Sequence, residues 1–340
     1  MSRWTCARIP VLRKIRNKHV RRFCAVGLVV LLVCTLWFTV NRVVAPLSAV
    51  RVVTMRTPLS NAPKYEGRLC IATYNIAHGR GTADTNWQVG RKASQLQRLD
   101  AIARLIEDRG ADIVVLNEVD FGSFWSSNVN QALYIAEKAG FPYLVEQRNY
   151  DTAVPFASLC WGNAVLSRHP VGNVSVVDFP AYSRWERVLA GHKKGLLCDI
   201  HLNGQISIRL LGVHLEHRSE RTRVQAAEMI GEIVKASPIP LLAAGDFNSS
   251  PVGFPKTHPT AEGKTALTSL LSTEAFRTTP LANPQPDDYT FPSTNPDRVI
   301  DWILIPADWR MLKKTVVSQD TSDHAAVFMQ VKVLPTKRGK

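Results

Sequence analysis

Side chains that can carry chemistry follow a short apolar run between residues 240 and 251, which reads P-L-L-A-A-G-D-F-N-S-S-P. The run Leu241 to Ala244 predicts a buried strand, and the glycine and polar residues after it predict the turn where the strand surfaces. Asp246 and Asn248 would then stand on a rigid support at a strand end, where active sites of layered α/β folds lie. Taken alone, the stretch fits an ordinary Asx turn better.

The same arrangement recurs along the chain, with an acid, an amide or a histidine beside the end of an apolar strand-like run. The residues concerned are Asn75, Glu118, His214, Asp246, Asn248, Asp301, Asp323 and His324. Turn chemistry alone does not account for this recurrence, and a carboxylate at the end of a valine-rich strand is costly unless paired or metal-bound. For any single member, a solvent-facing acid or a satisfied core histidine remains the alternative.

This set is rich in oxygen donors and contains no thiolate, which favours Mg²⁺, or Mn²⁺, over zinc. A hard cation suits phosphoryl chemistry because it neutralises charge on the non-bridging oxygens and on the leaving group. Histidines beside acids provide proton transfer, and a His–Asp pair fixes the tautomer and stabilises the imidazolium. The residues therefore predict metal-assisted attack of water on a phosphate ester.

The elements that must position these residues alternate between strands and helices, which predicts an α/β fold. Strand-like runs lie at 69–75, 112–116, 164–167, 174–179, 195–200, 206–215, 241–244, 301–305 and 326–333. Helical patterns lie at 96–106, 130–139 and 219–236. Residues 182–194 form a loop with five basic side chains, which either contacts an anionic substrate or is a solvated surface.

Charge is distributed unevenly between the N-terminal part and the rest of the chain. Residues 1–60 contain 11 Lys or Arg and no acid, whereas the other 280 residues carry 31 basic and 28 acidic side chains. The whole-chain charge of +14 is therefore poor evidence for nucleic-acid binding by the globular part. Nucleic acid stays a possible partner but not the favoured one.

The segment Phe23 to Val40 has 18 uncharged, mostly apolar residues, long enough to cross a bilayer. The basic flank before it predicts a cytoplasmic N-terminus, with the remaining chain on the extracytoplasmic side as a single-pass membrane protein. A cleaved signal peptide, a twin-arginine signal at Arg21-Arg22-Phe23 and lipidation of Cys34 fit the sequence less well. We therefore expect a signal anchor.

Five regions follow from these patterns. We expect a basic cytoplasmic segment at 1–22, a transmembrane signal anchor at 23–44, a linker at 45–67, a catalytic domain at 68–334 and a basic tail at 335–340. The linker contains three prolines and shows no clear periodicity. The six cysteines lack CxxC or Cys/His spacing, which favours inert thiols over a zinc site or a disulfide framework.

Seven short motifs, in order, resemble the endonuclease/exonuclease/phosphatase superfamily, which groups pancreatic-type deoxyribonucleases, apurinic endonucleases, neutral sphingomyelinases and inositol-polyphosphate phosphatases. They are T-Y-N at 73–75, L-N-E-V at 116–119, G-N-A-V-L-S-R-H-P at 162–170, V-H-L at 213–215, G-D-F-N at 245–248, I-D at 300–301 and S-D-H at 322–324. The resemblance spans about Arg68 to Val333. It implies a two-sheet β-sandwich flanked by helices, in four layers.

The resemblance also implies roles for the site residues. The implied metal ligands are Glu118, Asn75 and Asp323. The implied catalytic residues are His214, Asp246, Asn248, Asp301 and His324. Substrate contacts are expected at Asn163, Arg148 and His78. Asp246 would activate the water, Asn248 would hold a phosphate oxygen, and the two histidines would transfer protons and stabilise charge.

The chain departs from the family at Asn117, where the family usually has glutamine, so a contact behind the metal ligand can shift. The run Glu118 to Asp120 is more similar to lipid- and small-phosphoester-cleaving members than to apurinic endonucleases. We therefore expect a membrane-anchored Mg²⁺-dependent phosphodiesterase acting on a lipid headgroup or small phosphodiester. Alternatives are an extracytoplasmic nuclease and a non-catalytic binding module. The near-neutral charge of the domain and the membrane tether favour the phosphodiesterase over the nuclease. Every polar position that the family motifs require is present in this chain, which disfavours the non-catalytic binding module.

Overall fold

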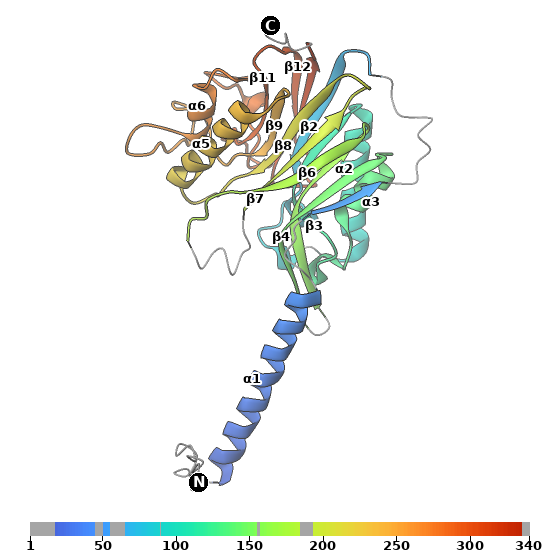
Figure 1. The fold of residues 1–340 in the computed structure, drawn as a ribbon, viewed down its shortest axis with the longest axis vertical. Helices are drawn as coiled ribbons and strands as arrows, with labels where there is room; N and C mark the ends of the chain where they lie inside the picture. Colours follow the sequence, from blue (N-terminus) through green and yellow to red (C-terminus); the bar gives the residue numbers. More distant parts are fainter. Residues whose placement is uncertain are drawn as a thin grey trace, which may run out of the picture.

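The computed structural model describes residues 18–44, 50–54, 65–88, 90–154, 157–183 and 193–334. Within these residues, two mixed β-sheets face each other (Figure 1). The seven-stranded sheet has the order β1 (Val50–Thr54), β4 (Tyr143–Val154), β5 (Ala157–Ser167), β3 (Ile113–Asp120), β2 (Arg68–Asn75), β13 (Ala326–Lys332) and β12 (Arg310–Val317). The six-stranded sheet has the order β10 (Phe276–Arg277), β11 (Asp301–Pro306), β9 (Leu241–Asp246), β8 (Ser207–His214), β7 (Lys194–His201) and β6 (Val171–Asp178).

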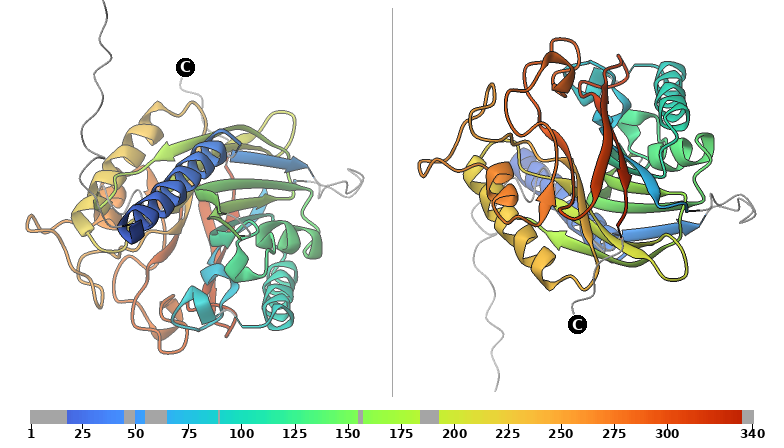
Figure 2. Two further views of the ribbon diagram at one scale, coloured as in Figure 1. Left: turned by 90° about the horizontal axis from the view of Figure 1, so that it is seen from below. Right: turned by 90° about the horizontal axis from the view of Figure 1, so that it is seen from above.

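Helices cover the outer face of each sheet, so the domain has four layers. Helices α2 (Lys92–Asp108) and α3 (Gln131–Lys138) pack on the seven-stranded sheet, and α5 (Glu220–Ala236) and α6 (Ala266–Leu271) pack on the other. Figure 2 shows the two helix groups on opposite sides of the sandwich. A third apolar cluster fills the space between the sheets. This arrangement confirms the predicted sandwich.

Apolar patterning explains why these layers form. The residues of β9 are all buried, as expected for a strand covered on both faces. In α2, the buried residues Leu99, Ile102 and Ile106 lie on one face at helical spacing. Buried area of this kind supplies the main stabilising free energy of the fold.

Each sheet has one parallel strand pair near its centre, whereas the other strand pairings of the described residues are antiparallel. β2 pairs with β3, which places Asn75 opposite Asn117, and β8 pairs with β9, which places His214 opposite Asp246. Parallel neighbours end at the same edge of a sheet. The topology therefore gathers four polar strand ends at one edge of the sandwich.

Gly245 permits the close packing at this edge. Its φ is +145°, and a Cβ added there would lie 1.8 Å from the carbonyl oxygen of Val213 on the neighbouring strand. Any other residue would force β8 and β9 apart, just where they carry His214 and Asp246.

The N-terminal helix α1 (Lys18–Val44) projects away from the sandwich (Figure 1). By length and composition it can cross a bilayer, and its apolar window from Lys18 to Trp37 is not buried inside the protein. A signal-sequence helix would meet the same criteria, so orientation and anchoring stay predictions. Of the basic segment expected at 1–22, residues 18–22 form the first turns of α1, and residues 1–17 lie outside the described residues, as does the tail at 335–340.

The expectation of a linker over 45–67 is corrected in its middle part. Residues 50–54, with the sequence V-R-V-V-T, form β1 and pair antiparallel with β4 at the sheet edge. Their β-branched side chains favour a strand, and β4 offers them an unpaired edge. Residues 45–49 and 55–64 lie outside the described residues.

Candidate active site

The ends of the two parallel strand pairs bring residues from both sheets together. The amide nitrogen of Asn75 lies 3.3 Å from Oε1 of Glu118 and 3.2 Å from Oδ2 of Asp246. Nε2 of His214 lies 3.9 Å from that Glu118 oxygen and 3.8 Å from that Asp246 oxygen. Four of the residues that the sequence singled out therefore lie in one cluster.

Asp301 and His324 extend the cluster from β11 and from the loop before β13. Nδ1 of His324 is 2.9 Å from Oδ2 of Asp301, and its Nε2 is 3.9 Å from Oδ2 of Asp246. Asp301 is the cross-strand partner of Asp246, which brings the two carboxylates close together. All three side chains are buried.

A β-bulge in β3 directs Glu118 into the cluster. The pairing of β3 with β5 changes register between Leu116 and Val119, and Glu118 has a φ of 51°. A bulge adds a residue to one strand and changes the direction of its side chain. Asn248, just beyond β9, also has a left-handed φ of 50°. Backbone strain of this kind concentrates at functional sites.

The orientation of Asn75 is fixed by the turn that follows β2. Its Oδ1 accepts a hydrogen bond from the backbone N–H of Ala77 at 3.0 Å, so its amide nitrogen faces the two carboxylates. Asn75 thus donates to Glu118 and Asp246 through its amide nitrogen, and one lone pair of its oxygen is used by the local turn. Its role as a metal ligand stays a prediction.

Asn117, the residue that departs from the family pattern, joins the two sheets behind the cluster. Its amide nitrogen donates to the carbonyl of Val213 at 3.0 Å and to Oδ1 of Asn163 at 2.9 Å. Its own Oδ1 accepts from the backbone N–H of Asp246 at 2.9 Å. The shorter amide therefore holds β3 against β8 and β9 at the height of the site.

The three expected substrate contacts fall into different places. Asn163 is completely buried and donates to Gln147 and to the carbonyl of Lys194, so its side chain positions Asn117. Arg148 forms ion pairs with Asp151 at 2.5 Å and with Glu146 at 3.7 Å within β4. His78, by contrast, lies beside Glu118, with 3.5 Å between its Nε2 and Oε2. For Asn163 and Arg148, contact with a substrate would require breaking these internal interactions.

Two basic residues that the site prediction did not include contact the cluster. Arg80 donates to Oε2 of Glu118 at 3.4 Å and to Oδ2 of Asp323 at 2.5 Å, so it links two acids far apart in sequence. Lys193 donates to Nε2 of His214 at 2.9 Å. Lys193 belongs to the basic loop 182–194, whose charge in the sequence already indicated possible contact with an anionic group. Arg80 follows the T-Y-N motif by only five residues, but an arginine in a loop gives no sign in the sequence that its side chain points into the site.

Positive charge surrounds Glu118. Burial alone would raise the pKa of Glu118, but the charges of His78, Lys193 and Arg80 outweigh burial and hold that pKa well below its usual range. His78 is itself buried, yet its hydrogen bond of 2.8 Å to Asp120 raises its pKa. Glu118 is therefore ionised throughout the physiological pH range.

Negative charge dominates around Asp246. Burial and the neighbouring charge of Asp301 raise the pKa of Asp246 to about 7. Burial would lower the pKa of His324, but its hydrogen-bonded partner Asp301 raises it to about 10. Burial and Lys193 together hold the pKa of His214 well below its usual range. The site thus combines a charged His324 with a neutral His214 and a carboxyl group that titrates near neutrality.

The acids fit a divalent cation at Glu118 and Asp323. Glu118 is ionised, Arg80 brings the two carboxylates together, and Oδ1 of Asp323 is buried without a hydrogen-bond partner. An unpartnered buried carboxylate oxygen is a suitable donor for a hard cation. Asp246, Asp301 and His324 also offer donor atoms within 4.8 Å of one another, but Asp301 and His324 already bind each other. We therefore favour Glu118 and Asp323 as the metal-binding acids.

A pocket of about 310 Å³ opens beside His324 and Asn248. Asn248 is held by its amide donation to the carbonyl of Leu215 at 3.1 Å and by its backbone N–H to Asp246 at 2.8 Å. Lys256, His258 and Arg298 also line this pocket, which gives it a basic wall suited to an anionic group. A substrate phosphate between Glu118 and this pocket would meet the whole cluster.

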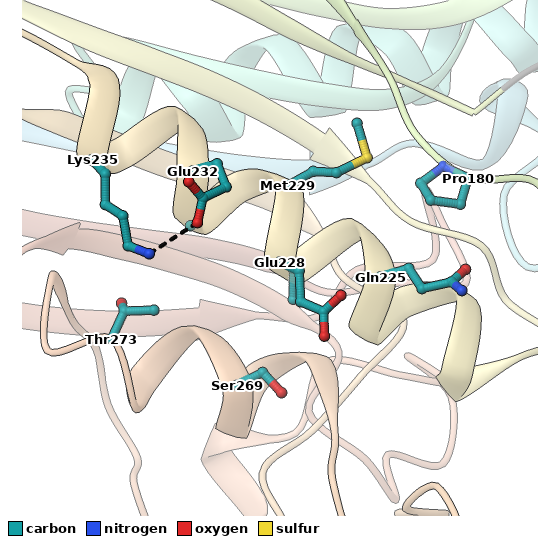
Figure 3. Close-up of a pocket in the computed structure, with 10 residues that line it drawn as sticks. Pro180, Gln225, Glu228, Met229, Glu232, Lys235, Ser269 and Thr273 are labelled. Atoms are coloured by element: carbon teal, nitrogen blue, oxygen red, sulfur yellow. Dashed lines mark hydrogen bonds and ion pairs between the residues drawn. The ribbon is translucent and has the colours of Figure 1, made fainter.

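A second hollow, of about 510 Å³, lies between α5 and α6 and is separate from the cluster (Figure 3). Glu228, Glu232, Lys235 and Ser269 line it, and Lys235 forms an ion pair with Glu232 at 2.9 Å. None of the residues that line this hollow belongs to the cluster at the strand ends.

The cysteines of the domain are buried and free. They are Cys70, Cys160 and Cys198, and burial raises their pKa values to about 11, 12 and 12. Thiols held in the protonated form are poor nucleophiles and poor metal ligands. The burial and raised pKa values of these three thiols agree with the expectation that they are inert.

Solved structures share this fold over most of the chain. An endonuclease/exonuclease/phosphatase from Beutenbergia cavernae is 22% identical with a TM-score of 0.58, covering 79% of this chain and 72% of that one. A family protein from Bacteroides thetaiotaomicron is 14% identical with a TM-score of 0.55, covering 78% and 97%. Truncated Caenorhabditis elegans TDP2 is 14% identical with a TM-score of 0.52, covering 78% and 98%. At these identities the likeness concerns the fold alone. A search of curated proteins found no significant match.

A family model covers nearly the whole sandwich. It describes the endonuclease/exonuclease/phosphatase family and matches residues 72–324, from within β2 to His324 of the His–Asp pair. The match thus spans both parallel strand pairs and the residues gathered at their ends. The chain belongs to the endonuclease/exonuclease/phosphatase family.

Proposed function

We propose that this protein is a divalent-metal-dependent phosphodiesterase, anchored to a membrane by α1. The observation that carries the proposal is the pairing of Glu118, kept ionised by surrounding cations, with Asp246, whose pKa is raised to about 7 beside the Asp301–His324 pair. The ionised Glu118 is suited to binding a metal ion, and Asp246 is suited to proton transfer near neutral pH. Mg²⁺ is the favoured ion for this oxygen-rich site, with Mn²⁺ as an alternative.

In the proposed mechanism, Glu118 and Asp323 would hold the cation, which would supply neutralisation of charge on the substrate phosphate. Asp246 accepts the proton from the attacking water, because a carboxyl group that titrates near 7 is an effective base at neutral pH. The hydrogen bond from Asn75 at 3.2 Å holds that carboxylate toward the cluster.

The histidines and Asn248 act on the phosphate. His324 is protonated, since Asp301 stabilises its imidazolium, and it offers a positive N–H to a phosphate oxygen. Asn248, in the pocket wall, positions another oxygen. His214 is neutral and receives a hydrogen bond from Lys193, so this pair supplies a positive charge carried by the lysine.

Membrane anchoring rests on α1 and on the charge around it. The helix has 27 residues, about 40 Å at 1.5 Å per residue, and its apolar window is exposed along its length. The basic residues before it favour a cytoplasmic N-terminus and an extracytoplasmic domain. We favour a lipid headgroup or a small phosphodiester as substrate. A nuclease is the second candidate, because Lys256 and Arg298 line the substrate pocket.

The proposal is tested with the full chain in a mild detergent, with Mg²⁺, with Mn²⁺ or with EDTA. The substrates are bis-p-nitrophenyl phosphate, plasmid DNA and a phospholipid panel that contains sphingomyelin. We expect metal-dependent hydrolysis that His324→Ala abolishes and that His201→Ala, at the end of β7 outside both the cluster and the pocket, leaves within a few-fold. The preferred substrate then separates a lipid phosphodiesterase from a nuclease.

Metal binding without hydrolysis of any of these substrates would contradict the phosphodiesterase proposal. A binding module on the same fold would then be the better description. Hydrolysis that persists in EDTA, or in His324→Ala, would contradict the assignment of the cluster as the active site.

A further inference from the structure

Five aromatic rings form a continuous ridge beside the cluster, which we call the aromatic ridge. Its members are Trp87, Phe124, Trp125, Tyr150 and Trp161. Tyr150 stacks on Trp161 with 4.4 Å between ring centroids, Trp161 lies 5.0 Å from Trp125, and Trp87 lies 5.9 Å from Trp125 and 5.7 Å from Phe124. The ridge therefore runs from half-buried rings to a side chain at its outer end, Trp87, that is 73% exposed.

Exposed apolar side chains that adjoin one another indicate an interaction surface more strongly than isolated ones do. Trp87 and Phe124, which is 37% exposed, adjoin each other and form one apolar patch. Arg91 and Lys92, both exposed, follow Trp87 closely in sequence. Tryptophan at the membrane–water interface, with basic residues nearby for lipid phosphates, is a recurrent combination in membrane-associated proteins.

The ridge lies next to the proposed metal-binding acids. Trp87 belongs to the short helix η4 (Asn86–Gln88) after β2, and Phe124 and Trp125 belong to η5 (Phe124–Ser126) after β3. The imidazole of His78 lies 6.1 Å from the ring of Trp125, and its Nε2 lies 3.5 Å from Oε2 of Glu118. One side chain thus separates the ridge from Glu118, so whatever contacts the ridge is close to the site.

The ridge and the site face the side of the domain that carries α1. Arg68, at the start of β2, pairs with Lys332 near the C-terminal end, which lies at the top of Figure 1 opposite α1. β2 therefore runs toward the α1 side and ends there at Asn75. The hairpin of β4 and β5 also extends to this side, where β4 packs against α1.

Lengths along the chain place the tip of the β4–β5 hairpin near the level of lipid headgroups. Tyr150 pairs with Trp161 four residues before β4 ends at Val154, about 13 Å from that end. The apolar segment of α1 ends at Val40, four residues before the helix ends at Val44, about 6 Å along its axis. The headgroup layer is about 5–8 Å thick on each side of a bilayer. The tip of the hairpin therefore lies at the depth of the headgroups, and Tyr150, at the inner end of the ridge, lies farther from the hydrocarbon.

We propose that the exposed outer end of the aromatic ridge, Trp87 and Phe124, contacts the headgroup layer of the bilayer that α1 crosses, and thereby holds the active-site opening against phosphoesters carried by that membrane. The inference rests on the proposed membrane anchor and narrows the substrate class to lipid-borne phosphoesters. The occupant is a lipid surface rather than a protein or a nucleic acid, because the ridge lies on the same side of the domain as a helix of membrane-spanning length.

The test measures whether Trp87 lies among headgroups in the full chain. The protein is reconstituted into phosphatidylcholine vesicles with or without a nitroxide on the choline headgroup, and co-flotation with the vesicles confirms insertion. Tryptophan emission is compared between the natural chain, Trp87→Phe and the control Trp309→Phe, whose ring is completely buried between the sheets. The emission that each substitution removes is the contribution of that tryptophan.

We expect the nitroxide to quench most of the emission assigned to Trp87 and little of that assigned to Trp309. Trp87 emission that the headgroup nitroxide leaves unchanged, but that water-soluble acrylamide quenches, would overturn the inference. Quenching of Trp87 only after addition of an oligonucleotide would overturn it as well, in favour of base stacking.

Hydrolysis of bis-p-nitrophenyl phosphate by the same vesicles separates this inference from the proposed function. Metal-dependent hydrolysis without quenching of Trp87 would leave the phosphodiesterase proposal standing and remove the membrane contact. Quenching without hydrolysis would do the reverse. Because Trp87 is not part of the catalytic cluster, Trp87→Phe should leave the hydrolysis of this soluble substrate unchanged.

Discussion

Glu118 and Asp246 occupy comparable places in the two sheets and have opposite electrostatic surroundings. Each lies at or near the end of a central parallel strand, β3 in one sheet and β9 in the other. Cations from nearby loops hold the pKa of Glu118 well below its usual range, whereas burial and Asp301 raise the pKa of Asp246 to about 7. The same functional group is thus prepared for two tasks by the residues that surround it.

Asn75 connects the two acids and keeps them distinct. Its amide nitrogen lies within 3.3 Å of an oxygen of each, so it holds them in one site without adding charge. Two carboxylates this close repel each other when both are ionised, and this repulsion raises the pKa of the one that has fewer cations near it. The difference between them therefore rests on the placement of Arg80, Lys193 and Asp301.

The largest expected effect comes from exchanging each acid for its isosteric amide. Glu118→Gln should abolish tight binding of Mn²⁺ and lower kcat/KM by about 10³-fold, because several kcal/mol of metal-derived stabilisation are lost. Asp246→Asn should lower kcat by a similar factor of roughly 10²–10⁴ while metal affinity changes little. Mn²⁺ titration followed by electron paramagnetic resonance, together with kinetics on bis-p-nitrophenyl phosphate, measures both.

The contrast between the two acids fails if the variants behave alike. Loss of Mn²⁺ binding in Asp246→Asn, with retention in Glu118→Gln, would reverse the assignment of roles. Equal loss in both would mean that the acids act as one ligand set.

Asp301→Asn should remove the negative charge that distinguishes Asp246 and His324. Without it, the pKa of His324 should fall from about 10 toward the ordinary histidine value, and the pKa of Asp246 should fall as well. We expect a loss of about 10²-fold in kcat, because the imidazolium is no longer stabilised. Titration of the His324 ring by nuclear magnetic resonance measures the pKa, with Asp297→Asn, a more exposed acid nearby, as the control. A His324 pKa that stays near 10 in Asp301→Asn would contradict this explanation.

Lys193→Met should weaken the positive surroundings of Glu118 and His214. The pKa of His214 should rise toward its ordinary value, since Lys193 contributes to lowering it. We expect kcat/KM to fall about tenfold, equivalent to about 1.4 kcal/mol of lost charge stabilisation. Lys235→Met, on the outer surface of α5, serves as the control and should keep full activity. Kinetics unchanged by Lys193→Met would show that the basic loop plays no part in the site.

The smallest effect should come from an ion pair that is not part of the site. Asp199 binds Arg209 at 2.7 Å and accepts a hydrogen bond from Asn173 at 2.8 Å, and these contacts lower its pKa although burial opposes them. Because the folded-state pKa is depressed, the stabilisation is present above the unfolded-state pKa and is lost as pH falls through the folded-state value.

Asp199→Asn should therefore lower the free energy of unfolding by about 1 kcal/mol at pH 7 and by much less in acid. Urea denaturation at pH 7 and at pH 3 measures this difference, with the exposed Asp108→Asn as the control. An equal loss at both pH values would mean that packing rather than charge accounts for the effect. Activity should not change, which separates this acid from Glu118 and Asp246.

Much of the site could be predicted because its residues follow apolar runs. Asn75, His214 and Asp246 end buried strands, and a buried strand that ends in a polar residue is visible in the sequence. The parallel pairing that brings these ends together follows from the family resemblance and the fold. β1, β4 and β12 were less predictable, because their polar or exposed residues break the apolar pattern.

Other features depended on contacts between distant segments. Arg80 and Asp323 are 243 residues apart and form an ion pair, and Lys193 reaches His214 from another loop. The Asn75 amide is oriented by its own turn, whereas Asn163 is buried by β4 and β7. No local pattern indicates which way a polar side chain points once the sheets have packed.

The sequence by itself determined which chemical groups are available and at which strand ends they stand, since strand length and polarity are local properties. Only the tertiary structure decided which acid is held ionised and which titrates near neutrality. The reason is that a pKa depends on burial and on charges brought close in space, and those charges come from loops far apart in the chain. The same holds for the aromatic ridge, whose five rings belong to four separate segments and become one surface only when β2 to β5 lie side by side.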